Sequence, residues 1–325
     1  LGGFASASHS EGAGSGWASI VTFQRTIARN TAGGADVLSA SIETRSRNFS
    51  PIGTGLPFNP YRYIAGASYS ATISDTVYAG LDARYSRGRD DEPDVGSLRA
   101  TGGWQISPRL NLTGDFGYDR VGGQNRLSAF FSLVFRFDRS SSLRADYDSR
   151  GDRKRLTYQT YHGTGTGAYN FSADIEHSDV GIVTGANGTL FSNRAELGFS
   201  HFGAFEGDLG GSTSQRTSLR FGTALAVADG AFSVGRPIQE SFAIVSPHAS
   251  LRGTDILIEP TGRSAAANSG ALGTALQPSL SSYSERNLLI TAPDAPLNTD
   301  LGEGSFRLLP PYRGGYRLTV GSDYM

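Results

Sequence analysis

The stretch 126–138, with the sequence RLSAFFSLVFRFD, decides the fold. Every odd position in it is apolar, from Leu127 to Phe137, whereas the even positions are mostly polar and include Ser132 and Arg136. Side chains alternate between the two faces of a β-strand, so a period of two separates an apolar face from a polar one. A helix would spread the same residues around its circumference. The stretch therefore predicts a strand with one face in apolar surroundings and the other in water.

The same alternation recurs along most of the chain. Between Trp17 and Val234 we count about fourteen segments, each roughly 9 to 14 residues long, the length of a tilted strand that crosses a bilayer. Strands of soluble proteins are shorter, with a mode near 5 to 6 residues. Clear further examples are 77–85, 110–116, 143–150, 169–176 and 219–227. The repetition predicts a mainly β protein with antiparallel strands.

The connections between these segments differ in length. Short polar turns are predicted at 74–75, 107–108, 138–140 and 192–193, and longer polar loops at 49–60, 87–95 and 204–212. Short turns at one end and longer loops at the other are typical of outer-membrane β-barrels.

Two architectures fit such alternating strands. In a soluble sandwich the apolar faces of two sheets fill a common core, whereas in a membrane barrel the apolar face meets lipid and the polar face lines an aqueous lumen. Fourteen long strands would make an unusually large sandwich. We therefore favour an antiparallel transmembrane β-barrel portion over residues 1–236. The absence of an apolar run of about 18 residues excludes only helical spans.

The pattern changes after Arg236-Pro237, because proline cannot donate a hydrogen bond to a strand ladder. Short strands separated by turns with Pro and Gly follow, and 288–290 form a continuous apolar run typical of a buried strand. We predict a small soluble β-sandwich domain over residues 237–312. Residues 313–325 are expected to be a linker or the beginning of a further domain, and 316–320 could form a strand.

Composition argues against several classes of function. The 29 basic and 30 acidic residues give a net charge of −1, which does not suit a protein that holds nucleic acid. The lack of cysteine excludes a disulfide framework, thiolate catalysis and Cys-based metal sites. The cluster Gly163–Gly167 lacks the lysine of a phosphate-binding loop, and we interpret it as a turn. Five scattered histidines form no zinc-binding pair: His9, His162, His177, His201 and His248. We predict no metal, no cofactor and no enzymatic activity.

A resemblance to a known family rests on the region after the alternating strands. Segment 235–245, GRPIQESFAIV, resembles the barrel exit of fimbrial outer-membrane ushers, and 310–315, PPYRGG, resembles the segment that leads into the final usher domain. Other positions match the family's spacing: Gly273, Ala275, Leu276, Pro278, Leu280, Tyr283, Asn287 and Leu289. The chain is thus similar to the later strands of an usher barrel, followed by the first C-terminal periplasmic domain, and we expect it to be a fragment or a processed chain.

The resemblance implies a function in the chaperone–usher pathway. An usher receives pilus subunits from a periplasmic chaperone, translocates them and assembles them into a fibre. The implied location is the outer membrane of a Gram-negative bacterium, with the C-terminal domain in the periplasm. The implied partners are chaperone–pilin complexes, pilus subunits and outer-membrane lipid, with no nucleic acid, and a homodimer is left open.

Two sets of residues are candidate functional residues. Charged residues on polar strand faces are expected to line the lumen: Arg144, Asp146, Asp148, Asp174 and Glu176. The alternative, an acid/base pair among these carboxylates, is disfavoured because Arg144 and Arg150 stand beside them. By the resemblance, the small domain contacts chaperone–subunit complexes, and the candidate contacts are Tyr283, Arg286, Tyr312 and Arg313.

Three rival functions come from other classes. A passive porin or uptake barrel with a periplasmic appendage is the main alternative, and it needs no periplasmic chaperone. A soluble β-rich adhesin would be a second. An outer-membrane enzyme barrel would need a Ser/His/acid constellation, which we do not find in the sequence.

Overall fold

The computed structural model of the chain describes residues 1–12, 14–28, 34–50, 59–207, 211–262, 264–295, 301 and 304–322. Within these ranges the protein is almost entirely β, with two short 3-10 helices, Ala249–Leu251 (η1) and Gly270–Leu272 (η2). No helix in the described ranges is long and apolar enough to cross a membrane. The chain forms two compact units, Leu1–Thr157 with Glu176–Gly181, and Tyr158–Ile175 with Ile182–Met325.

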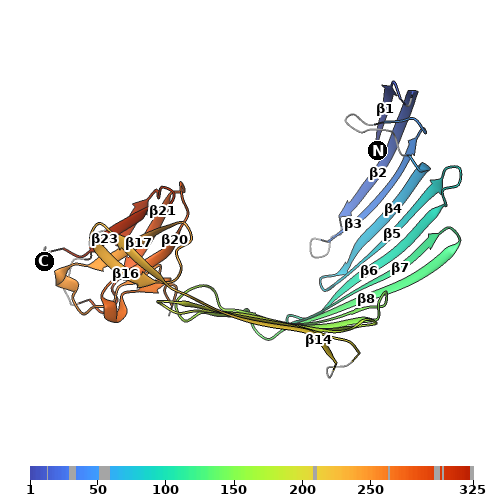
Figure 1. Ribbon diagram of the computed structural model, residues 1–325. Helices are drawn as coiled ribbons and strands as arrows, with labels where there is room; N and C mark the ends of the chain where they lie inside the picture. Colours follow the sequence, from blue (N-terminus) through green and yellow to red (C-terminus); the bar gives the residue numbers. More distant parts are fainter. Residues whose placement is uncertain are drawn as a thin grey trace. The chain divides into compact units, whose positions relative to one another are not determined.

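Fourteen strands form one large sheet, in which each strand lies beside its neighbours in the sequence (Figure 1). The strands are β1 (Gly2–Ser10), β2 (Gly14–Ala28), β3 (Ala35–Arg45), β4 (Tyr61–Ser74), β5 (Val77–Gly88), β6 (Val95–Ser107), β7 (Leu110–Val121), β8 (Gln124–Arg136), β9 (Ser141–Asp148), β10 (Arg153–Tyr161), β11 (Tyr169–Ser178), β12 (Gly181–Phe191), β13 (Glu196–Phe205) and β14 (Ser212–Gly222). The predicted antiparallel β architecture is confirmed, although the first strand begins well before Trp17.

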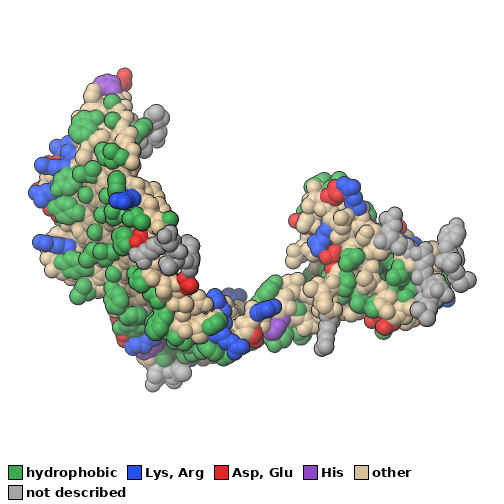
Figure 2. Space-filling view, turned by 180° about the vertical axis from the view of Figure 1, so that it is seen from behind, with side chains coloured by type: hydrophobic (Ala, Val, Ile, Leu, Met, Phe, Trp, Pro, Cys, Tyr) green, Lys and Arg blue, Asp and Glu red, His purple; other side chains and the backbone are tan. Residues whose placement is uncertain are grey.

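The pairing of β8 converts the sequence alternation into two faces. Ser132 lies opposite Thr113 of β7 and Asp146 of β9, whereas Leu133 lies opposite Leu112 of β7. Paired residues share a face of the sheet, so polar side chains gather on one side and apolar ones on the other. Leu133 remains 39% exposed, and Figure 2 shows hydrophobic side chains gathered over the strands of the sheet. Within the described residues of the first unit, the apolar side chains thus lie on an open face of the sheet without a second sheet over them.

The strand order assigns the connections to two ends of the sheet. The predicted short turns follow even-numbered strands, and the predicted long loops follow odd-numbered strands. Because antiparallel neighbours run in opposite directions, short turns and long loops lie at opposite ends. The connection 162–168 is an exception, since it is longer and lies at the short-turn end. Residues 51–58 and 208–210 of the predicted long loops lie outside the described residues.

The strand predicted over 219–227 is divided in the structure. β14 ends at Gly222, and β15 (Ala224–Ala228) pairs with β16 (Ala231–Gly235) as a separate hairpin. Thr223 lies at the break, where its hydroxyl donates to the carbonyl oxygens of Arg194 (2.8 Å) and Gly235 (3.1 Å). The alternation of apolar residues continues across this break, which is why the sequence does not reveal it.

The residues after the hairpin form a β-sandwich, as predicted. One sheet has the order β20 (Ala275–Leu280), β17 (Ser241–Pro247), β23 (Gly315–Val320). The other has the order β19 (Ala267–Asn268), β18 (Leu257–Ile258), β21 (Arg286–Thr291), β22 (Ser305–Leu308). A dry core lies between the two sheets and includes Val245, Ile258 and Leu288, none of which is exposed.

The β15–β16 hairpin adds a third layer. Ile244 of β17 and Leu276 of β20 point away from the main core and pack against Ala226, Ala228 and Ala231 of the hairpin. Successive residues of a strand face opposite sides, so one sheet supplies both cores. The three-stranded sheet is therefore covered on both faces.

The C-terminal residues correct one expectation. Residues 315–320 do not form a linker, because they are the strand β23, which pairs with β17 in parallel from Phe242↔Gly315 to Pro247↔Val320. Leu318 and Val320 are 7% and 1% exposed and belong to the main core. Of the two interpretations of 316–320, the strand is the correct one.

Candidate functional site

The polar face of the sheet is the first candidate site. We define it by residues that neighbouring strands place on one side of the first unit: Ser68, Asp82, Arg99, Asp115, Ser132 and Asp146. Small hydroxyl residues pair directly across strands, as in the hydrogen bond of 2.6 Å between Ser39 Oγ and Ser68 Oγ. Ser, Asp and Arg on one face give a surface that water wets well.

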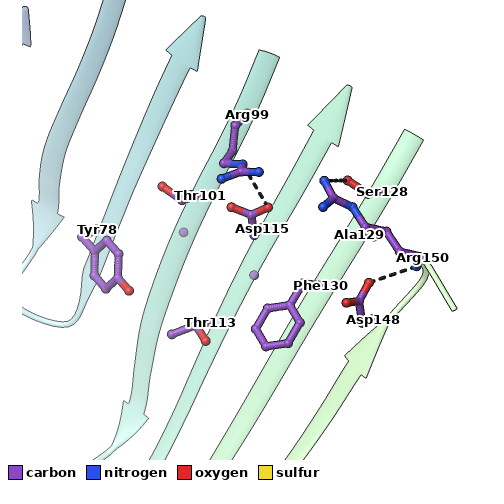
Figure 3. A pocket seen from close by; sticks show the side chains of 12 residues that line it. Tyr78, Arg99, Thr101, Thr113, Asp115, Ser128, Ala129, Phe130, Asp148 and Arg150 are labelled. Atoms are coloured by element: carbon purple, nitrogen blue, oxygen red, sulfur yellow. Dashed lines mark hydrogen bonds and ion pairs between the residues drawn. The ribbon is translucent and has the colours of Figure 1, made fainter. Parts of the chain in front are cut away.

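Ion pairs cross the middle of this polar face, around a shallow hollow of about 450 Å³ (Figure 3). Arg99 Nε lies 3.5 Å from Asp115 Oδ1. Arg150 Nη2 lies 3.4 Å from Asp119 Oδ2 and donates to Ser128 Oγ at 3.3 Å. Exposed pairs of this kind contribute at most about 1 kcal/mol each to stability. Within each of these pairs the opposite charges partly neutralise each other, so the pair attracts other charged groups less than either residue alone would.

Tyr78 adds an aromatic ring to the same hollow. A Cβ atom built on Gly103 would lie 2.1 Å from Tyr78 Cε1, so the ring rests directly on the glycine backbone. Figure 3 shows Tyr78 and Phe130 among the charged residues of the hollow. Glycine at position 103 is therefore what allows the ring to lie close to the sheet.

Three of the predicted lumen residues lie on this polar face. Arg144, Asp146 and Asp148 occupy alternate positions of β9, and Arg144 Nε donates to Asp146 Oδ1 at 2.8 Å. Asp148 Oδ1 accepts from the backbone N–H of Arg150 at 2.9 Å, and its other oxygen lies 3.8 Å from Arg153. Sequence alternation thus brings these three together.

The other two predicted lumen residues, Asp174 and Glu176, occupy alternate positions of β11 and are half-buried. Asp174 stands close to β12, because a Cβ atom on Gly185 would lie 2.7 Å from Asp174 Oδ1. The small size of Gly185 leaves room for this carboxylate.

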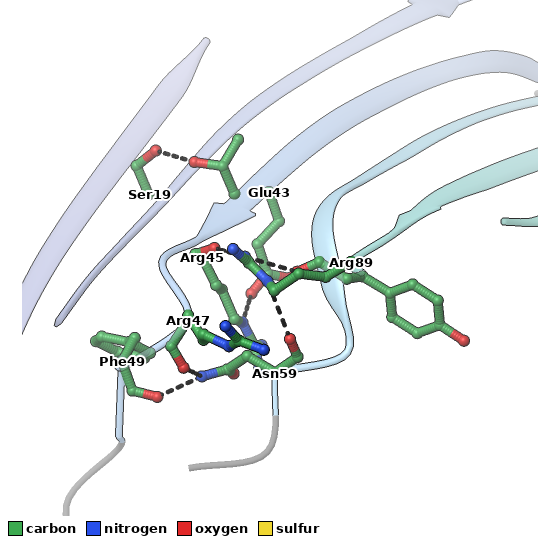
Figure 4. A network of polar contacts seen from close by, with 9 residues as sticks. Ser19, Glu43, Arg45, Arg47, Phe49, Asn59 and Arg89 are labelled. Atoms are coloured by element: carbon green, nitrogen blue, oxygen red, sulfur yellow. Dashed lines mark hydrogen bonds and ion pairs between the residues drawn. The ribbon is translucent and has the colours of Figure 1, made fainter. Parts of the chain in front are cut away.

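The long-loop end of the sheet is held by arginine (Figure 4). Arg89 donates to the carbonyl oxygens of Arg45 (2.5 Å), Asn59 (3.3 Å) and Tyr61 (3.3 Å). Asn59 in turn donates to the carbonyl oxygen of Phe49 at 2.6 Å. The loop 87–95, predicted only as a longer polar loop, therefore anchors both ends of the loop before it.

The second candidate site is the contact between two turns of the sheet and the sandwich, which we call the joint. It lies within the second unit. Arg194, in the β12–β13 turn, donates to the carbonyl oxygens of Val234 (2.6 Å) and Thr274 (2.9 Å) and also to that of Ser269. Burial lowers the pKa of the Arg194 guanidinium, and the negative charge of Asp255 opposes this shift. Several acceptors around one guanidinium offset the cost of removing it from water.

Other contacts extend the joint. Thr166 N, in the β10–β11 connection, donates to Ala265 O at 2.8 Å. Arg236 donates to the carbonyl oxygens of Thr164 and Ala266, and its guanidinium lies 5.6 Å from the ring centre of Phe191. Burial also lowers the pKa of Arg236. Beside these contacts lies a cleft of about 610 Å³, lined by the β10–β11 connection, by the strand ends Phe191 and Glu196, and by β20.

The joint is not predicted from the sequence. The residue pattern indicates only turns at 192–193 and 163–167, and at Arg236-Pro237 only the end of the alternation. The sequence holds only two weak indications of this contact. One is the Asn193-Arg194 pair in a tight turn, and the other is Arg236, where the alternation of apolar residues stops. The acceptors are mostly backbone carbonyl oxygens, which leave no trace in the sequence.

The candidate contact residues of the sandwich fall into two places. Tyr283, Tyr312 and Arg313 are exposed. They lie on two loops that are neighbours, because the backbone N–H of Tyr283 donates to the carbonyl oxygen of Pro310 at 2.7 Å. Arg313 stacks on the ring of Tyr312, with 5.2 Å from guanidinium to ring centre. Arg286 instead lines the cleft at the joint, 3.9 Å from Glu259. The structure therefore joins three of the four residues into one surface.

Within the described residues, no group of three or more His, Asp or Glu side chains is arranged to hold a metal ion. Several charged residues of the polar face form ion pairs, such as Arg99 with Asp115 and Arg144 with Asp146. Exposed ion pairs of this kind suit a hydrated surface.

Comparison with known proteins supports the fold. No protein-family model and no curated protein matches the chain. Among solved structures, it is similar to a chain in the cryo-EM structure of the E. coli P pilus tip assembly intermediate PapC–PapD–PapK–PapG in the second conformation. The TM-score is 0.56 at 11% identity, and the match covers 96% of this chain and 39% of that chain. The likeness shows that the two chains share a fold, and this chain spans about two fifths of the length of the other.

Proposed function

We propose that the chain is part of an outer-membrane usher, which translocates pilus subunits delivered by a periplasmic chaperone and assembles them into a fibre. The fourteen-stranded sheet would form part of the barrel wall, and the sandwich would lie in the periplasm. The similar structure is an assembly of PapC with PapD, PapK and PapG, a pilus intermediate, which supports partners of that kind for this chain.

One observation carries the proposal: the separation of the two faces along the whole run of antiparallel strands. Leu98 is 44% exposed on one face, while its neighbour Arg99 pairs with Asp115 on the other. An exposed apolar face of this extent would be a liability in water. It becomes an advantage when lipid covers it and the polar face lines an aqueous channel.

The polar face also suits a channel for folded proteins. A channel with apolar walls would bind each passing subunit through the hydrophobic effect. Ser, Thr and paired Arg and Asp side chains keep their own water, so they hold a protein surface only weakly. We assign Arg144, Asp146, Asp148, Asp174 and Glu176 to the channel lining.

Single-cysteine variants test this orientation, because the chain has no cysteine of its own. Arg99→Cys and Arg144→Cys, in a membrane, are expected to react with a thiol reagent that dissolves only in water. Leu98→Cys and Leu143→Cys are matched controls one residue away on the opposite face, and they are expected to stay unlabelled. The reverse pattern would overturn the orientation and the proposed function with it.

The joint and the sandwich favour an usher over a passive porin. The polar face alone fits either function, but a porin needs no domain fixed to its turns. We propose that Tyr283, Tyr312 and Arg313 contact chaperone–subunit complexes. Tyr312→Ala and Arg313→Ala are expected to weaken capture of a purified chaperone–subunit complex, whereas Arg307→Ala, on β22, is not. Undiminished capture by both loop variants would remove these residues from the contact.

A further inference from the structure

The β15–β16 hairpin carries an exposed apolar face that neither core uses. Leu225 and Val227 of β15 are 72% and 68% exposed, and Phe232 of β16 is 53% exposed. The pairs Leu225↔Val234 and Val227↔Phe232 place these side chains together on one side of the hairpin. We call this surface the outer face of the hairpin. It contains no polar or charged side chain.

The opposite side of the hairpin is held firmly. Ala226, Ala228 and Ala231 are at most 9% exposed and pack on Ile244 and Leu276. A Cβ atom on Gly235 would lie 2.5 Å from Leu276 Cδ2, so the hairpin approaches the three-stranded sheet as closely as its backbone allows. The outer face therefore cannot turn inward to escape water.

The tip of the hairpin is equally well defined. Asp229 and Gly230 have φ angles of 45° and 74°, the left-handed pair that a two-residue type I′ turn requires. Arg317 of β23 donates to the carbonyl oxygen of Asp229 at 3.1 Å. This exposed arginine stands beside the tip, where it could meet an anionic headgroup.

The outer face continues the apolar stripe of the last sheet strand. Leu219 and Phe221 of β14 are 81% and 66% exposed, and Leu225 and Val227 follow at the same alternating spacing. Thr223 ties the two strands at the break through its bonds to Arg194 O and Gly235 O. The hairpin thus begins where the proposed lipid-facing surface of the sheet ends.

We propose that the outer face of the hairpin inserts into the membrane surface next to the sheet and anchors the sandwich to the lipid. The inference rests on the proposed function, because it requires that the apolar face of β14 contacts lipid. Insertion would be shallow, at the boundary between headgroups and acyl chains, as for other amphipathic surface elements. Arg317 at the tip favours a bilayer with anionic lipid.

The side-chain chemistry favours lipid over a protein partner. Protein interfaces owe most of their affinity to Trp, Tyr and Arg, whereas Leu and Val are under-represented among their strongest contacts. The outer face consists of Leu, Val and Phe and has no group that could give a directional contact. Acyl chains need no such group, since their attraction to apolar surface is non-directional.

Site-specific fluorescence in lipid vesicles tests the proposal on the whole chain. Val227→Cys and Phe232→Cys would be labelled with bimane, and vesicles of phosphatidylethanolamine and phosphatidylglycerol would carry a doxyl quencher near the headgroup end of the acyl chain. We expect about twofold or greater quenching at both positions. Leu289→Cys is the matched control, because Leu289 is 48% exposed on the opposite outer layer of the sandwich, and it is expected to show no quenching.

Leu219→Cys on β14 separates the two ways of failing. If bimane at 219 is quenched while 227 and 232 are not, the hairpin does not contact lipid and the anchor is overturned, although the proposed function stands. If 219 is not quenched either, the proposed function fails as well. Fluorescence at 227 that changes only when a chaperone–subunit complex is added would also overturn the anchor and assign the face to a protein partner.

Discussion

Asn193 and Asn268, 75 residues apart in the chain, hydrogen-bond to each other in both directions. Asn193 Nδ2 donates to Asn268 Oδ1 at 2.6 Å and to Asn268 O at 2.8 Å, while Asn193 Oδ1 accepts from Asn268 N at 2.9 Å. Only an amide side chain offers donor and acceptor together in this geometry. The pair therefore sets how the β12–β13 turn lies against the sandwich.

Asn193→Asp is expected to loosen the joint. The change keeps the shape and the acceptor but replaces the donating Nδ2 by an oxygen, which would face two acceptor atoms of Asn268. Losing these bonds at a half-buried site costs about 1 to 3 kcal/mol. Hydrogen exchange at β19 and at residues 269–274 should accelerate accordingly.

Asn170→Asp is the matched control for this experiment. Asn170 Oδ1 accepts a hydrogen bond from the backbone N–H of His162 at 3.1 Å. The carboxylate of Asn170→Asp can accept the same hydrogen bond. Equal acceleration in both variants would mean that the Asn193–Asn268 pair does not hold the joint.

The last strand of the sandwich gives a second prediction. Leu318 of β23 is 7% exposed within the main core, so Leu318→Ala is expected to lower the free energy of unfolding by about 2 to 5 kcal/mol. Thr319, its exposed neighbour on the same strand, should tolerate the change to Ala within about 0.5 kcal/mol. Denaturant unfolding measures both. A small effect of Leu318→Ala would show that residues 315–320 are not integral to this domain.

Alternation in the sequence was sufficient to predict the sheet, because a strand's period of two depends only on which side chains meet water. The residues of β9 show this, since Arg144, Asp146 and Asp148 lie on one face as expected. The same signal failed at Thr223, where the alternation runs on from Phe221 to Leu225 although the strand ends. The break depends on hydrogen bonds to Arg194 and Gly235, and such long-range acceptors cannot be read from spacing.

Of the two candidate sites, the sequence could predict one and not the other. The polar face follows from a repeated pattern, so its residues could be named from the sequence. The joint depends on single residues that bind distant carbonyl oxygens, as Arg194 does with Val234. Tyr283 and Tyr312 were grouped by the family resemblance, and their adjacency follows from one backbone bond between Tyr283 and Pro310.

Glu240 predicts a dependence of stability on pH. The pKa of Glu240 is lowered from its ordinary value of 4.5, chiefly because the carboxylate accepts the backbone N–H of Ser282, at 2.8 Å. A lowered pKa means that the folded chain binds fewer protons than the unfolded chain. The stabilisation is therefore complete above about pH 4.5 and is lost as the pH falls through the lowered pKa. Glu240→Gln, which can still accept the N–H, should show a flatter loss of stability in acid, whereas an unchanged acid limb would contradict this role.

Arg99→Met tests whether the polar face acts as a weakly binding channel wall. The ion pair with Asp115 is exposed, so we expect the free energy of unfolding to change by less than about 1 kcal/mol. Methionine would, however, offer apolar surface to a passing subunit, and about 1 to 2 kcal/mol of added contact would lengthen its stay about five- to thirtyfold. Leu98→Met places the same side chain one residue away on the apolar face, which we propose meets lipid, and should leave passage unchanged. Release of subunits from the full assembly, followed over time for both variants, measures the difference. If Arg99→Met and Leu98→Met release subunits at the same rate as the unmodified chain, the polar face does not line the path of the subunits.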